Sequence, residues 1–134
     1  NRTPTKSPIV LIDEYSGMFD SYDLDTRKIL AMHWPGPNSI ILPSQLGPTW
    51  ITRGNRSVAY RMPDNNDLRS LLHQTGPLIA PSANPEGLPP ASTIKQTKEY
   101  FGDMIDYYFD SGTTHNQQPS SLFRYHNGTM SKLR

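Results

Sequence analysis

Short apolar runs alternate with amphipathic segments along the first two-thirds of the chain. Residues 9–12 read Ile-Val-Leu-Ile, a continuous apolar run that predicts a strand buried on both faces. In residues 25–33, Ile29 and Leu30 share one face with His33, which predicts a helix. The same reasoning predicts strands at 38–42, 57–61, 77–81 and 104–109. It also predicts one helix from the N-cap Asp64 to about Thr75 and another from the N-cap Ser92 to about Phe101.

The end of the chain has the pattern of a β-hairpin. Two strand-like runs, residues 121–125 and 129–133, flank the turn sequence His126-Asn127-Gly128. Asn-Gly favours such a turn because both residues tolerate a positive φ. Strands separated by helices, followed by a hairpin, predict an α/β fold: an open twisted mixed β-sheet with packed helices.

Composition narrows the class of protein. A length of 134 residues suits a single domain, and the absence of cysteine excludes disulfides and thiolate chemistry. The formal net charge of +1 means that affinity for an anion must come from local placement of charge. No apolar run approaches the roughly 20 residues that a membrane helix needs. We therefore expect a cytoplasmic protein without a membrane segment, and we read the chain, which begins with Asn1, as a fragment of something longer.

Several common catalytic motifs are missing from the sequence. The four histidines fall in different predicted elements, and no pair has the i, i+4 spacing of a zinc motif, so we predict no metal site. There is no Gly-x-Ser-x-Gly elbow, Walker loop or Gly-x-Gly-x-x-Gly. No residue is therefore assigned as a catalytic nucleophile.

Small polar residues and arginines instead lie at or beside the ends of the predicted strands. They are Arg61, Ser82, Asn84, Ser120 and Arg134. Ligands of open α/β sheets bind outside strand ends, and arginine matches the oxygens of a carboxylate or phosphate. We expect these side chains to surround one cavity that binds anions. The alternative is that Ser-Ala-Asn only makes a turn and that Arg61 only pairs with Asp64.

Five sequence segments, in order, resemble the signatures of YrdC-like domains. They are Trp34-Pro-Gly-Pro, Val58-Ala-Tyr-Arg-Met-Pro, Gly76-Pro-Leu-Ile-Ala-Pro-Ser-Ala-Asn-Pro-Glu-Gly, Pro119-Ser120 and Leu133-Arg134. That family contains L-threonylcarbamoyladenylate synthases. The resemblance implies a nucleotidyltransferase that converts threonine, bicarbonate and ATP into threonylcarbamoyl-AMP and pyrophosphate for tRNA modification. ATP would be a substrate accompanied by Mg²⁺, and tRNA-modification proteins would be partners.

The resemblance also implies roles for individual residues. The positions that correspond to ATP contacts are Arg2, Lys6, Ser57, Ser82, Asn84 and Arg134. Arg61 and Ser120 correspond to positions that hold threonine, and Arg61 would bind the carboxylate of the threonine. The family's leading Pro-Thr-x-Thr-x-Tyr-Gly segment has no match, so we expect residues 1–134 to be one YrdC-like domain without that segment.

Three other functions fit the same residues. Arg53, Arg56 and Arg61 lie close together in the sequence, which is compatible with an RNA-binding module. YrdC-like domains also occur inside carbamoyltransferases of hydrogenase maturation, which suggests a carbamoyl-handling domain. The last alternative is a truncated, inactive domain that retains only ATP binding.

Overall fold

The chain forms two compact units. The computed structural model describes residues 7–113 and 118–134, so Arg2 and Lys6, which we predicted to bind ATP, lie outside the described residues. Among the described residues, one unit comprises 7–80 and 120–134, and the other comprises 81–113 and 118–119. We call their described parts the sheet unit and the loop unit. That the two units belong to one domain stays a prediction.

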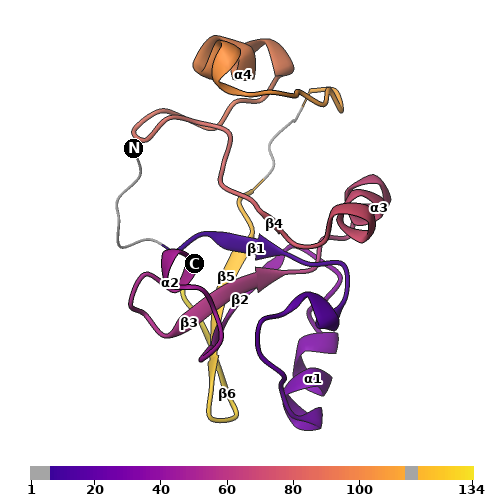
Figure 1. Cartoon of the computed structure of the whole chain (residues 1–134), viewed down its shortest axis with the longest axis vertical. Helices are drawn as coiled ribbons and strands as arrows, with labels where there is room; N and C mark the ends of the chain where they lie inside the picture. The colour runs from indigo at the N-terminus through magenta and orange to yellow at the C-terminus, as the bar shows by residue number, and fades with distance from the viewer. Residues whose placement is uncertain (1–6, 114–117) are drawn as a thin grey trace. The chain divides into compact units, whose positions relative to one another are not determined.

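A six-stranded mixed sheet forms the sheet unit, which confirms the predicted fold class. Its strands run β4-β1-β3-β2-β5-β6 across the sheet. β1 is parallel to β3 and β2 to β5, whereas the other neighbours are antiparallel. Figure 1 shows the early β1 and the late β5 and β6 contributing to the same sheet. The bounds are β1 Ile9–Leu11, β2 Asn38–Pro43, β3 Ser57–Arg61, β4 Leu78–Ile79, β5 Ser121–His126 and β6 Thr129–Lys132.

The helices begin where side chains can satisfy their free backbone amides. In α1 (Leu24–Ala31), the Asp23 carboxylate accepts a hydrogen bond from the Thr26 amide at 2.7 Å. The same helix buries Leu30 completely in the main core, which also contains Ile40 and Tyr60. The remaining α-helices are α2 (Thr49–Thr52), α3 (Asn66–Thr75) and α4 (Ile94–Phe101), and short 3-10 turns occupy Tyr15–Gly17 and Gly102–Met104.

Two N-cap predictions were wrong by one residue. Asn65, not Asp64, caps α3 by accepting from the Leu68 amide, and Thr93, not Ser92, caps α4 by accepting from the Gln96 amide. In both cases the neighbouring polar residue satisfies the same sequence preference, and only the local backbone decides between them. Helix α2 was not predicted, because its four residues are too few to show a helical period.

The strand predicted at 104–109 is also wrong. Met104 ends a 3-10 turn, and residues 105–110 belong to no sheet. The aromatic side chains of this segment are largely exposed, Tyr107 at 76% and Phe109 at 80%. A strand requires a neighbouring strand for its backbone hydrogen bonds, and none of the described strands pairs with this segment. A short run of apolar and aromatic residues by itself therefore gave the wrong element.

The terminal hairpin is confirmed, and the loop unit contrasts with the sheet. Asn127 and Gly128 have φ values of +48° and +78°, as the Asn-Gly turn requires. In the loop unit, no described side chain is buried. None of the helices in the described parts of the chain is long and apolar enough to span a membrane.

Candidate functional site

One end of the sheet brings three of the predicted residues together. Tyr60 of β3 lies opposite Ile40 of β2, so one step further along this antiparallel ladder Arg61 lies opposite Ser39. β5 begins beside the start of β2, and Ser120 immediately precedes it. Arg134 follows β6, the antiparallel neighbour of β5, at the same end. We call this the Arg61 end of the sheet.

Ser57 lies at the opposite end of the sheet. It starts β3, where it pairs with Pro43, whereas Arg61 finishes the same strand. Four steps of an extended strand separate the two residues by about 13 Å. The predicted ATP residues Ser57 and Arg134 are therefore not neighbours in the sheet unit.

The Trp34–Pro37 turn links the segments that carry Arg61 and Ser120. Gly36 donates its N–H to the Met62 carbonyl at 2.9 Å and accepts from Arg61 Nε at 3.1 Å. The Pro37 carbonyl accepts from the Ser121 amide at 3.1 Å. The turn therefore bonds the side chain of Arg61 directly and holds the residue that follows Ser120.

Arg61 is a half-buried cation. Burial lowers the pKa of its guanidinium, because a poorly solvated environment disfavours the charged form. The alternative pairing with Asp64 does not occur, and within residues 7–113 and 118–134 no carboxylate forms an ion pair with Arg61. A partly desolvated guanidinium without a carboxylate partner is suited to binding an anionic ligand.

Ser120 is held from two sides. Its Oγ lies 3.0 Å from the Oγ of Ser39, and its carbonyl accepts from Arg134 Nη2 at 3.1 Å. Ser39 is fully buried. Ser39 was not predicted as a site residue, because it stands within a run predicted to be a strand. The available signal was a hydroxyl placed directly before the apolar run of residues 40–42.

Ser82 and Asn84 belong to the loop unit, where Asn84 shapes its own segment. Its Nδ2 donates to the carbonyls of Pro85 at 3.1 Å and Leu88 at 2.7 Å, and its backbone N–H donates to the Ser82 carbonyl at 2.9 Å. The turn that we considered as an alternative is therefore present. Contact of Ser82 and Asn84 with ATP stays a prediction.

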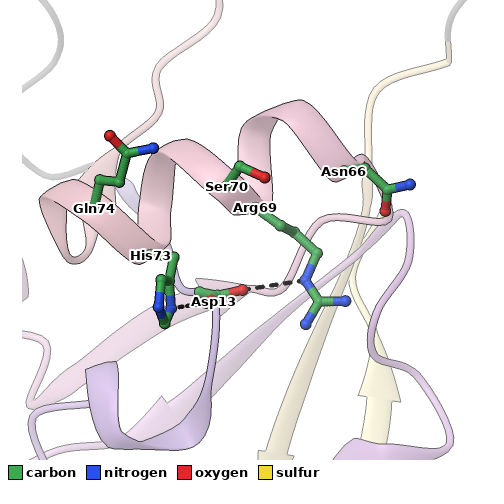
Figure 2. A pocket seen from close by; sticks show the side chains of 6 residues that line it. All are labelled: Asp13, Asn66, Arg69, Ser70, His73 and Gln74. Carbon is green, nitrogen blue, oxygen red and sulfur yellow. Dashed lines mark hydrogen bonds and ion pairs between the residues drawn. The ribbon is translucent and has the colours of Figure 1, made fainter.

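The two hollows described in the sheet unit lie elsewhere on its surface. The larger, of about 470 Å³, is lined by Asp13, Asn66, Arg69, Ser70, His73 and Gln74. Figure 2 shows the Asp13 carboxylate between α3 side chains, 3.2 Å from Arg69 Nε and 3.2 Å from His73 Nδ1. A second hollow of about 220 Å³ is lined by residues of the 15–27 segment. No predicted site residue lines either one, so a shared cavity stays a prediction.

The geometry bears on two further points, a metal site and the RNA-binding alternative. In the described segments, no group of three or more histidine, aspartate or glutamate side chains could hold a metal ion. Arg53 ends α2, and Arg56 precedes β3 at its Ser57 end, whereas Arg61 finishes that strand. The three arginines of the RNA-binding alternative therefore do not form one patch.

An open mixed sheet with arginine and serine side chains at one end defines an α/β domain suited to small anionic ligands. A family model, Sua5/YciO/YrdC, described as "Telomere recombination", matches residues 1–134. The chain belongs to this family, which confirms the resemblance seen in the sequence.

Curated relatives in two bacterial genera carry the same name. The chain is 34% identical over 126 residues to a threonylcarbamoyl-AMP synthase of Pseudomonas fluorescens, covering 91% of this chain and 68% of that protein. It is 40% identical over 93 residues to the protein of that name from Marinobacter nauticus, covering 67% of this chain and 49% of the relative. The matches thus span between half and about two-thirds of these two relatives.

Solved structures share the fold. The crystal structure of P. abyssi Sua5 complexed with L-threonine matches with a TM-score of 0.86 and 27% identity, over 99% of this chain and 41% of that one. E. coli YciO matches with a TM-score of 0.74 over 98% of this chain and 66% of that one. At 17% identity, the YciO match supports the fold alone.

Proposed function

We propose that this chain is part of a threonylcarbamoyl-AMP synthase, a nucleotidyltransferase that uses ATP, L-threonine and bicarbonate. The observation that carries the proposal is Arg61, a half-buried guanidinium with no carboxylate partner in the described structure, held at the sheet end that also carries Ser120. The names of the relatives support this reaction, and the threonine complex of P. abyssi Sua5 supports an amino-acid ligand.

The reaction needs no nucleophile from the protein. The amine of threonine takes up bicarbonate to form a carbamate, with loss of water. An oxygen of the carbamate then attacks the α-phosphorus of ATP, and the bond to the departing pyrophosphate breaks. The protein contributes by holding two anions in line and by placing positive charge near them. Arginine and serine side chains are suited to this task, because they donate hydrogen bonds without taking part in covalent chemistry.

Arg61 and Ser120 would hold the amino acid. Because Gly36 fixes Arg61 Nε, the outer nitrogens Nη1 and Nη2 would meet the carboxylate of threonine. ATP would contact Arg2, Lys6, Ser57, Ser82, Asn84 and Arg134, with Mg²⁺ accompanying its phosphates. Other tRNA-modification proteins would receive the product in the cytoplasm.

The test is pyrophosphate release by the full-length protein that contains this chain, in the presence of ATP, threonine and bicarbonate. Release should require all three. Arg61→Ala should raise the KM for threonine by about 10- to 100-fold, the loss of a hydrogen bond to a charged group, and should leave the KM for ATP nearly unchanged. Arg124→Ala, which removes an exposed arginine of β5, is the matched control and should change neither constant. Absence of threonine-dependent release would refute the proposed reaction.

A further inference from the structure

Two serine hydroxyls are buried near opposite ends of β2. Ser39, the second residue of the strand, is fully buried, and Ser44, directly after the strand, is 6% exposed. The Ser44 hydroxyl bonds the carboxylate of Asp20. The Ser39 hydroxyl bonds the hydroxyl of Ser120 at 3.0 Å. Two chemically equivalent groups near one strand therefore support different parts of the molecule.

The position of Ser39 connects it with both residues of the proposed amino-acid site. Directly opposed residues of an antiparallel ladder point to the same face of a sheet, so Ser39 and Arg61 share a face. The hydroxyl of Ser39 reaches Ser120 from this position. Ser39 thus lies between the segment that carries Arg61 and the segment that carries Ser120, although neither family signature nor sequence pattern singled it out.

We propose that Ser39 is a positioning residue for the amino-acid substrate, because it orients the hydroxyl of Ser120. This inference rests on the proposed function. A fully buried hydroxyl has no access to solvent and retains the partner that the fold provides. Ser120 is only partly buried, so its hydroxyl could otherwise turn toward water. The bond to Ser39 keeps the Ser120 hydroxyl in one orientation before the substrate arrives, which reduces the cost of ordering it on binding.

The central experiment compares Ser39→Ala with Ser44→Ala in the intact chain. Titration calorimetry measures the dissociation constants of L-threonine and of ATP for each variant. Ser39→Ala should weaken threonine binding by about 3- to 10-fold, the range expected for one neutral hydrogen bond, and leave ATP binding unchanged. Ser44→Ala removes an equally small buried hydroxyl, so it should lower thermal stability without changing the threonine constant. Equal weakening by the two variants, or no effect of Ser39→Ala, would overturn the inference.

A double-mutant cycle separates positioning from a general structural effect. If Ser39 acts through Ser120, Ser39→Ala should cause no further loss of threonine affinity in a Ser120→Ala background. Additive losses would mean that Ser39 acts by another route and would overturn the inference. A wild-type chain that binds no threonine would instead refute the proposed function, and the inference with it, so the two failures are distinguishable.

Discussion

Helices α1 and α4 have the same length and very different surroundings. Each has eight residues and a polar N-cap, Asp23 in α1 and Thr93 in α4. Helix α1 buries Thr26 and Leu30, whereas α4 buries nothing. Local sequence signals are therefore sufficient to place both helices, but only α1 contributes to a buried core. We infer that the sheet unit carries most of the folding free energy and that the loop unit depends on local hydrogen bonds.

The largest effect should come from truncating the buried side chain of α1. Leu30→Ala leaves a cavity among the core residues of the sheet and should lower the free energy of unfolding by about 2–5 kcal/mol. Urea denaturation provides the measurement. Two control variants are Leu24→Ala, at a 68% exposed position of α1, and Ile94→Ala in α4. Each should lower the free energy of unfolding by less than about 1 kcal/mol. A large loss from Ile94→Ala would contradict the contrast between the two helices.

A smaller effect on stability should come from protonation of the Asp20 carboxylate, which joins two segments of the sheet unit. Its carboxylate accepts from the Ser44 hydroxyl and from the amides of Gln45 and Leu46, at 2.8 and 3.2 Å for the two amides. Burial would raise the pKa of Asp20, but these hydrogen bonds outweigh burial, and the pKa lies below its usual value.

The sign of this shift fixes the pH window. A carboxyl whose pKa is lowered by folding stabilises the native state above the ordinary aspartate value, and that contribution is lost as pH falls from about 4 through the lowered value. Asp20→Asn should therefore flatten the acid limb of stability against pH and cost about 1–3 kcal/mol at neutral pH. Asp106→Asn, at an exposed position of the loop unit, corrects for the change in net charge. An unchanged acid limb in Asp20→Asn would show that the carboxylate contributes nothing there.

Elements with strong local patterns were predictable, and those that depend on a partner were not. The strand at 57–61 and the Asn-Gly hairpin follow from residue type and turn chemistry. The segment at 104–109 is also rich in apolar and aromatic residues, but it has no neighbouring strand in the described structure, so its sequence could not reveal its state. The sequence pattern indicates which helices and strands are possible, and tertiary contacts determine which of them form.

The same limit applies to the candidate site. Arg61 and Ser120 could be singled out because polar residues at strand ends are visible in the sequence. Ser39 could not, because its role depends on a contact with a residue 81 positions away. The bond from Arg61 to Gly36 likewise joins segments that only the folded register brings together. The residues that we propose to contact the substrate therefore have a sequence signal, whereas the contacts that hold them in place become visible only in the fold.

The smallest predicted effect tests whether α4 can open without the sheet. Thr93→Ala removes the hydroxyl that accepts from the Gln96 amide at 3.2 Å, and an N-cap of this kind contributes about 1 kcal/mol. Because α4 has no buried side chain, we expect the loss to appear as roughly fivefold faster hydrogen exchange of α4 amides, with no change in the amides of β3. Asp23→Ala removes the equivalent cap of α1, whose helix packs into the core, and should speed exchange in β3 as well. If Thr93→Ala accelerates exchange in β3 to the same extent, α4 and the sheet open together, and the contrast between the two units does not hold.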